Sequence, residues 1–187
     1  NFPGVILHSS KYPGGDGFKG KRCIVLGANS SAHDICADLW EHGVDVTMIQ
    51  RTPTTVVRSE TLMEIGFKSL YSEEAVANGI DVDKADMIFA SQPFRLLPDA
   101  QRAMYADIAA RDADLIARLN KAGFKTDYGF DGSGLLMKAL RTGSGYYIDV
   151  GCSELIASGA VKVRSDVEIK KLKAGSLLLS DGSEVAA

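Results

Sequence analysis

Six consecutive residues near the amino-terminus have the types and the spacing of a phosphate-binding segment. Gly27 opens the segment, Ala32 closes it, and the residues between them are Ala28, Asn29, Ser30 and Ser31. In a Gly-x-Gly-x-x-Gly/Ala segment the first glycine makes a tight turn, and the last small residue lets a helix pack closely on a strand. Asn29 stands in the middle position, where its side chain holds a phosphate slightly further out than glycine would. The segment predicts a pyrophosphate site, and the alternative is an ordinary tight turn.

The flanking residues place this segment between a strand and a helix. Residues 23–26 are a short apolar run, typical of a buried parallel strand. From Ser31 onward the spacing is helical as far as Gly43, and the residues predicted to share the buried face are Ala32, Ile35, Leu39 and Trp40. A β-branched second strand is predicted over 44–49. A strand, glycine turn, helix and strand within about 30 residues form a dinucleotide-binding unit, in which the helix N-terminus faces the pyrophosphate.

The end of the second predicted strand indicates which dinucleotide binds. NAD sites carry an acidic residue here to hold the ribose hydroxyl, whereas this chain has Gln50, Arg51 and Thr52. A guanidinium matches a phosphate in geometry and charge, and Thr52 adds a hydroxyl beside it. These residues predict NADP(H) rather than NAD(H), and the alternative is a solvated arginine at a strand end.

The composition is that of a globular α/β protein with a full core. The chain has 187 residues, of which 45% are apolar and 24% charged, and its net charge of −3 gives no reason to expect nucleic acid or an anionic membrane as a partner. No apolar run is long enough to cross a bilayer, and no secretory signal opens the chain. Cys23, Cys36 and Cys152 are odd in number and far apart. We therefore expect reduced thiols, no metal site and a cytoplasmic location.

A second motif precedes the glycine segment. Residues 2–12 read Phe-x-Gly-x-x-x-His-x-x-x-Tyr, with the histidine at His8 and the tyrosine at Tyr12. This pattern resembles the fingerprint of the class B flavin-dependent monooxygenases, in the version that ends in Tyr and is typical of the flavin-containing monooxygenases. In that family the fingerprint stands just before the second of two glycine motifs, the one that binds NADPH. Gly27 follows at the expected short distance, and the resemblance extends to about Val57.

The resemblance implies a reaction and its cofactors. NADPH bound to this chain would reduce FAD held by another domain, and the reduced flavin would react with oxygen to oxygenate a small organic substrate. His8 would position NADPH near the hinge between the two nucleotide domains, and the alternative is a hydrogen-bonded structural histidine. Because no FAD glycine motif precedes Phe2, the FAD domain is expected to lie outside the chain, and the chain alone is expected to be inactive. The alternatives are an NADPH-dependent flavin reductase and a non-catalytic NADP-sensing module.

The whole chain is thus predicted to be a Rossmann-like, three-layer α/β domain that binds NADP(H) over residues 1–187, with a helical insertion at about 58–150. His33 and His42 are expected to face solvent. In the insertion, 81–86 is predicted to be a solvated connection, and one helix of about 22 residues is predicted to begin at Asp99 as its cap. A second glycine cluster at 142–147 is predicted to be a structural turn, or else to bring Tyr146 and Tyr147 toward the nicotinamide or the flavin.

Toward the carboxyl end the sequence returns to strands. A third parallel strand is predicted over 161–163, after a short helix that ends at Gly159. Residues 167–172 and 177–179 alternate around Gly175, which predicts a β-hairpin.

Overall fold

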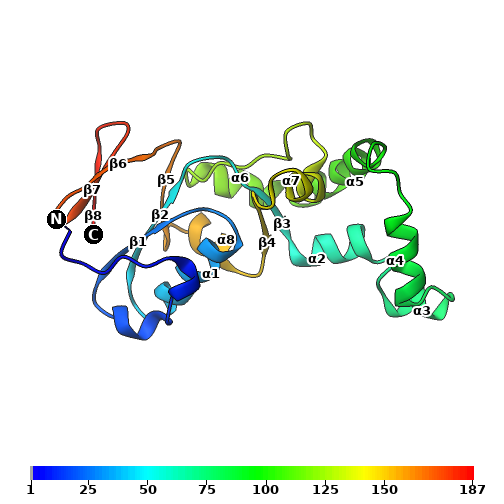
Figure 1. The fold of residues 1–187 in the computed structure, drawn as a ribbon, viewed down its shortest axis with the longest axis horizontal. Helices are drawn as coiled ribbons and strands as arrows, with labels where there is room; N and C mark the ends of the chain where they lie inside the picture. Colours follow the sequence, from blue (N-terminus) through cyan, green and yellow to red (C-terminus); the bar gives the residue numbers. More distant parts are fainter. Residues whose placement is uncertain (1) are drawn as a thin grey trace. The chain divides into compact units, whose positions relative to one another are not determined.

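The structure, a computed structural model, describes residues 2–187, which divide into two units (Figure 1). The first unit comprises the residues up to Thr54 together with 117–126 and 151–187. The second unit comprises 55–116 and 127–150. The chain passes between the units four times, and one of these boundaries falls within helix α6 (Ala113–Lys121).

A parallel sheet forms the centre of the first unit, with its strands in the order β1–β2–β5 (Figure 1). The bounds are Arg22–Leu26 for β1, Asp45–Gln50 for β2 and Lys162–Ser165 for β5. Cys23 pairs with Val46, and Thr47 pairs with Lys162. The strands predicted at 23–26, 44–49 and 161–163 are therefore confirmed, with small shifts at their ends. The prediction that 23–26 is buried is wrong, because β1 is an outer strand of this sheet and its residues are half-buried or, like Leu26, exposed.

Helix α1 (Ser30–Glu41) connects β1 to β2 and packs against both strands and against α8 (Cys152–Ala157) (Figure 1). The helix ends as predicted, because His42 is its C-cap and Gly43 follows in the left-handed conformation with φ 73°. Its buried face consists of Ala32, His33, Cys36 and Leu39. Trp40 is 42% exposed, so its predicted place on the buried face is wrong. The buried stripe is narrower than the one predicted and includes a histidine.

His33 is fully buried, so the prediction that it faces solvent is wrong. Its Nδ1 lies 3.0 Å from the backbone carbonyl oxygen of Asn29, and its ring packs edge-on against Phe124 with centroids 5.5 Å apart. A hydrogen-bonded ring with an aromatic neighbour is stable in a core. His42 is half-buried rather than solvent-facing, because its Nδ1 lies 2.7 Å from the carbonyl oxygen of Asp38.

An antiparallel sheet follows β5 and completes the first unit. Its strands are β6 (Ile169–Leu172), β7 (Ser176–Leu179) and β8 (Glu184–Ala186), in that order. The predicted hairpin is thereby confirmed, and β8 was not predicted. A core cluster joins this sheet to β2, formed by Ile49, Val167, Leu177, Leu179 and Val185. Because side chains alternate along a strand, Val46 and Met48 lie on the opposite face of β2 from Ile49.

The second unit contains a parallel pair of strands, β3 (Thr55–Arg58) and β4 (Tyr146–Asp149). Of the two, β4 lies within the helical insertion predicted at about 58–150, where no strand was expected. A core cluster of this unit consists of Val57, Leu62, Tyr105 and Ile108. The helices of the unit are α2 (Ser59–Thr61), the π-helix η3 (Leu62–Phe67), α3 (Glu73–Ala77), α4 (Val82–Ala90), α5 (Leu97–Arg111) and α7 (Gly134–Thr142).

Several expectations for this region are wrong. The long helix is divided at Asp112 into α5 and α6, and Asp99 lies in the first turn of α5 rather than at its N-cap. Residues 81–86 begin helix α4, because Asp81 caps it by accepting a hydrogen bond from the backbone N–H of Lys84 at 2.9 Å. Tyr147 is 1% exposed and accepts a hydrogen bond from the N–H of Val150 at 3.1 Å, so it belongs to the core of its unit.

Two further features complete the fold. The 3₁₀ helices η1 (Ser9–Lys11) and η2 (Gly15–Phe18) precede β1. Cys36 and Cys152 are buried and Cys23 is half-buried, and burial raises the pKa of Cys36 above the range of an ordinary thiol. Along residues 2–187 no helix combines the length and the apolar character needed to span a bilayer.

Candidate functional site

The glycine segment lies where β1 ends and α1 begins. Gly27 donates its backbone N–H to the carbonyl oxygen of Ile49 at 3.0 Å and has a φ of 139°, which residues with a side chain rarely adopt. A Cβ added at Gly27 would lie 3.5 Å from the Cβ of Ala32. The small residues at both ends of the segment therefore allow the first turn of α1 to lie close over the end of the strand.

Backbone N–H groups in this segment are available to a ligand. Asn29 is the N-cap residue of α1 in an extended conformation (φ −105°, ψ −173°), and its side chain makes no capping hydrogen bond. Within residues 2–187, the N–H groups of Ala28, Asn29 and Ser31 donate no hydrogen bond. The first turn of α1 carries no acidic side chain. The partial positive charge of the helix N-terminus is therefore available to an anion, which fits the pyrophosphate of a dinucleotide.

Arg51 and Thr52 follow β2 directly, and both are exposed. Because Leu26 pairs with Ile49 in a parallel register, Gly27 and Arg51 leave the sheet at the same edge. No other group in the described part of the chain forms a hydrogen bond or an ion pair with the Arg51 side chain. The structure thus places a glycine turn with available N–H groups beside a strand end with an available guanidinium.

His8 is exposed and makes only local contacts. It is the N-cap residue of η1, where its Nδ1 accepts a hydrogen bond from the N–H of Ser10 at 3.2 Å and lies 2.9 Å from the Ser10 hydroxyl. In the described structure no hydrogen bond joins His8 to the glycine segment. A role for His8 in positioning NADPH stays a prediction.

Tyr12, the last residue of the amino-terminal motif, anchors the amino-terminal segment to α1. Its hydroxyl donates a hydrogen bond to Oδ2 of Asp38 at 2.6 Å, and its ring stacks on Phe18 with centroids 6.1 Å apart. Burial, together with the hydrogen bond to this carboxylate, raises the pKa of Tyr12 above its usual range. This contact could not be predicted from the sequence, because Tyr12 and Asp38 are far apart along the chain.

Gln50 is a second residue whose role the sequence analysis missed. This fully buried side chain lies at the end of β2, where its Oε1 accepts a hydrogen bond from the N–H of Lys125 at 2.7 Å and lies 3.0 Å from the hydroxyl of Ser165. Its Nε2 donates to the carbonyl oxygen of Lys125 at 2.9 Å and to Oγ1 of Thr54 at 3.2 Å. Both ends of the buried amide are therefore satisfied. The sequence feature that could have indicated this role is the uncharged polar side chain of Gln50 at the end of an otherwise apolar strand.

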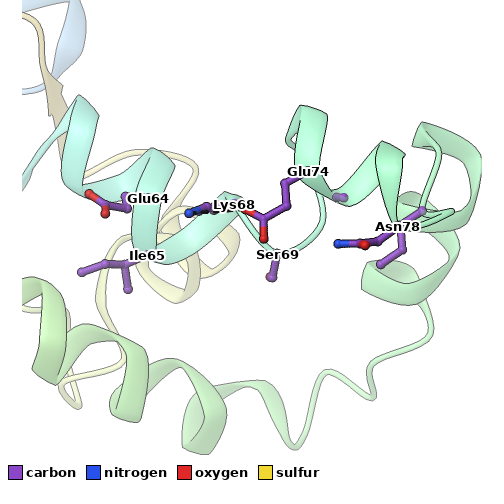
Figure 2. A pocket seen from close by; sticks show the side chains of 8 residues that line it. Glu64, Ile65, Lys68, Ser69, Glu74 and Asn78 are labelled. Atoms are coloured by element: carbon purple, nitrogen blue, oxygen red, sulfur yellow. Dashed lines mark ion pairs between the residues drawn. The ribbon is translucent and has the colours of Figure 1, made fainter.

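A hollow of about 280 Å³ in the second unit contains none of the predicted site residues (Figure 2). Its lining comes from η3, α3 and the adjoining turns, and consists of Glu64, Ile65, Lys68, Ser69, Glu74, Ala75, Asn78 and Ile80. Figure 2 shows Glu74 directed toward Lys68, and their charged groups lie 3.4 Å apart. Nowhere in residues 2–187 do three or more His, Cys, Asp or Glu side chains gather to hold a metal ion.

Comparison with known proteins finds a family that part of the chain resembles. Residues 1–69 match the family model described as FMO-like, flavin-binding monooxygenase-like. These residues, fewer than half of the chain, are similar to the flavin-binding monooxygenases. This match includes the segment, Phe2 to about Val57, on which the sequence resemblance was based.

Individual proteins that are similar to this chain are named as monooxygenases. The chain is similar to the indole-3-pyruvate monooxygenase YUCCA8 of Oryza sativa subsp. indica, with 29% identity over 99% of this chain and 37% of that protein. The probable indole-3-pyruvate monooxygenase YUCCA10 of Arabidopsis thaliana is 41% identical over 33% of this chain and 16% of its own length. The chain thus spans little more than a third of the length of YUCCA8.

The fold is similar to that of a solved flavin monooxygenase structure. Cyclohexanone monooxygenase from Rhodococcus sp. Phi1, in a structure bound to NADP⁺, superimposes with a TM-score of 0.58 and 19% identity. The match covers 99% of this chain and 40% of that enzyme. At this identity the likeness shows that the two share a mixed α/β fold.

Proposed function

We propose that the first unit is a Rossmann-like, three-layer domain that binds NADP(H) for a flavin-dependent monooxygenase. The arrangement of its elements supports this, since α1 packs on β1 and β2 while the antiparallel sheet packs on Ile49 of β2. The sheet order β1–β2–β5 is that of the first half of a dinucleotide-binding fold. The observation that carries the proposal is the edge of the parallel sheet at which the Gly27 turn lies beside Arg51.

In this proposal each predicted site residue has a defined role. The N–H groups of Ala28, Asn29 and Ser31 bind the pyrophosphate, Gly27 makes the turn that places them, Ser30 lies beside the phosphate in the first turn of α1, and Ala32 leaves room for it. Arg51 and Thr52 bind the 2′-phosphate that distinguishes NADPH from NADH. His8 orients the nucleotide from the amino-terminal segment.

The chain's own contribution to the reaction is to bind and orient the nucleotide and to exclude water from it. When bound, NADPH would supply a hydride to FAD, which we propose is held by another domain of the whole protein, and the flavin would then support oxygenation of a small organic substrate. Two relatives are named for indole-3-pyruvate and one neighbour for cyclohexanone. Neither compound is assigned to this chain, because the residues that select a substrate are not identified in it.

The proposal predicts that the chain binds NADPH more tightly than FAD, because it carries one glycine turn and that turn lies beside Arg51. Calorimetric titration of the chain with NADPH, NADH and FAD measures all three affinities under one condition. Tighter binding of FAD than of NADPH would contradict the proposal. Equal affinity for NADPH and NADH would contradict the proposal that Arg51 binds the 2′-phosphate. It would still be consistent with a dinucleotide site at the glycine turn.

The close packing of Ala32 over Gly27 gives a second prediction. Ala32 is buried in the first turn of α1 next to Gly27, and Ala32→Val adds two methyl groups there, so we expect the helix to shift away from the turn. Overpacking of this kind costs about 1–3 kcal/mol, and we expect NADPH affinity to fall roughly tenfold. Ala32→Ser is the control, because it adds a single atom and should bind like the parent. If the valine variant binds NADPH as well as the parent, the phosphate site lies elsewhere.

A further inference from the structure

Resting on the proposed function, we infer that Gln50 and Thr54 are positioning residues for the nucleotide. Neither side chain touches the bound phosphate. Together they hold the Ala28 peptide in the orientation that presents the N–H of Asn29 to it.

The first step is the fixed orientation of the Gln50 amide. Its Oε1 faces the N–H of Lys125 at 2.7 Å, and its Nε2 faces the carbonyl oxygen of the same residue at 2.9 Å. Reversing the amide would place donor against donor and acceptor against acceptor. In a fully buried side chain both mismatches are costly, so Nε2 is directed permanently toward Thr54.

The second step is the direction of the hydrogen bonds through Thr54. Its Oγ1 accepts from Nε2 of Gln50 at 3.2 Å, so its single hydroxyl proton is available to donate to the carbonyl oxygen of Ala28 at 2.8 Å. Thr54 is itself buried, and its backbone N–H donates to the carbonyl oxygen of Lys125 at 3.1 Å. The chain of hydrogen bonds therefore runs from Gln50 through Thr54 to Ala28.

The third step follows from the planar trans peptide bond. The carbonyl of Ala28 and the N–H of Asn29 belong to one peptide plane and point in opposite directions. When Thr54 holds that carbonyl, the N–H of Asn29 points away from Thr54, and in the described structure it donates no hydrogen bond. The next carbonyl, that of Asn29, is also held, because it accepts from the N–H of Ala32 at 2.9 Å and of His33 at 3.1 Å.

These contacts fix the turn before any ligand arrives. A peptide free to rotate would lose entropy on binding, and in its reversed orientation it would point a carbonyl dipole at the phosphate. Removing the Thr54 hydroxyl should therefore weaken nucleotide binding without removing any group that contacts the nucleotide. The expected loss is roughly two- to tenfold, the equivalent of one neutral hydrogen bond.

The test compares the 187-residue chain with three variants. Thr54→Val removes the hydroxyl with little change in shape, Thr54→Ser retains it, and Thr126→Val removes a threonine hydroxyl that bonds instead to Asn120 at 3.1 Å. Thr126 is a matched control because its backbone bridges to Thr54 while its hydroxyl does not touch the glycine segment. Calorimetry gives the affinity for NADP⁺, and the ¹³C chemical shift of the Ala28 carbonyl, measured without nucleotide, reports the hydrogen bond itself.

We expect Thr54→Val to change the ¹³C chemical shift of the Ala28 carbonyl and to lower the affinity for NADP⁺. In Thr54→Ser and Thr126→Val the chemical shift and the affinity should both equal those of the parent. If Thr54→Val does not fold, Thr54→Cys takes its place, since a thiol is a weaker donor than a hydroxyl. The inference alone is overturned if the parent binds NADP⁺ and Thr54→Val binds it equally well, or if Thr126→Val loses as much. A parent with no measurable affinity for NADP⁺ would overturn the proposed function as well.

Discussion

Replacement of Arg51 by alanine is expected to weaken NADPH binding by roughly ten- to a hundredfold and to leave NADH binding nearly unchanged. Losing one charge-assisted contact to a phosphate costs about 1.5–3 kcal/mol, which corresponds to that range of affinity. The guanidinium is exposed and forms no hydrogen bond or ion pair with any described residue, so the substitution breaks no internal contact. The difference between the two nucleotides therefore reports on the 2′-phosphate alone.

The control for Arg51 is an arginine at the other end of the same sheet. Arg22 is exposed at the start of β1, and Arg22→Ala removes the same charge far from the glycine turn. Dissociation constants for both nucleotides should be measured at one salt concentration, because salt screens exposed charges. A parallel loss for both nucleotides would mean that Arg51 supports the fold, and no loss for either would leave it as a solvated strand end.

Replacement of Asp112 by alanine is expected to give the largest loss of stability in the second unit. The Asp112 carboxylate is buried and accepts hydrogen bonds from the backbone N–H of Arg58 at 2.8 Å and from the hydroxyl of Thr61 at 2.6 Å. Its removal leaves two donors unsatisfied, at about 1–3 kcal/mol each. We therefore expect the free energy of unfolding to fall by roughly 3 kcal/mol or more.

Urea denaturation of the parent and the variant measures this loss. Glu64→Ala is the control, because it also removes a carboxylate from an ion pair, here with Arg111 at 2.5 Å, but from an exposed surface where such pairs contribute little. Its denaturation midpoint should stay close to that of the parent. Equal midpoints for the Asp112 and Glu64 variants would show that the buried carboxylate does not hold β3 and α2 in place.

The parts of the fold that depend on local sequence were predictable. The strand that ends at Leu26, the glycine turn and the helix that ends before Gly43 follow from short-range periodicity and backbone preference. The hairpin of β6 and β7 is another example, because its alternation and its glycine lie within a few residues of each other. The site residues Gly27, Ala32 and Arg51 were found in the same way, and their contacts with the nucleotide stay predictions.

The features that were missed depend on contacts between distant parts of the chain. His33 is buried because Phe124 packs against it, and helical spacing alone does not indicate that neighbour. The break between α5 and α6 coincides with Asp112, whose carboxylate bonds to residues near β3, although the helical pattern continues through it. The pairing of β3 with β4 likewise joins two segments separated by most of the second unit.

Helix α1 connects the glycine turn mechanically to the amino-terminal segment. Its first turn follows the site at which a phosphate would bind, and Asp38, two turns further along, holds the hydroxyl of Tyr12. A helix of 12 residues, about 18 Å long, moves as one body. The hydrogen bond between Tyr12 and Asp38 therefore ties the segment that carries His8 to the helix whose first turn follows the glycine turn.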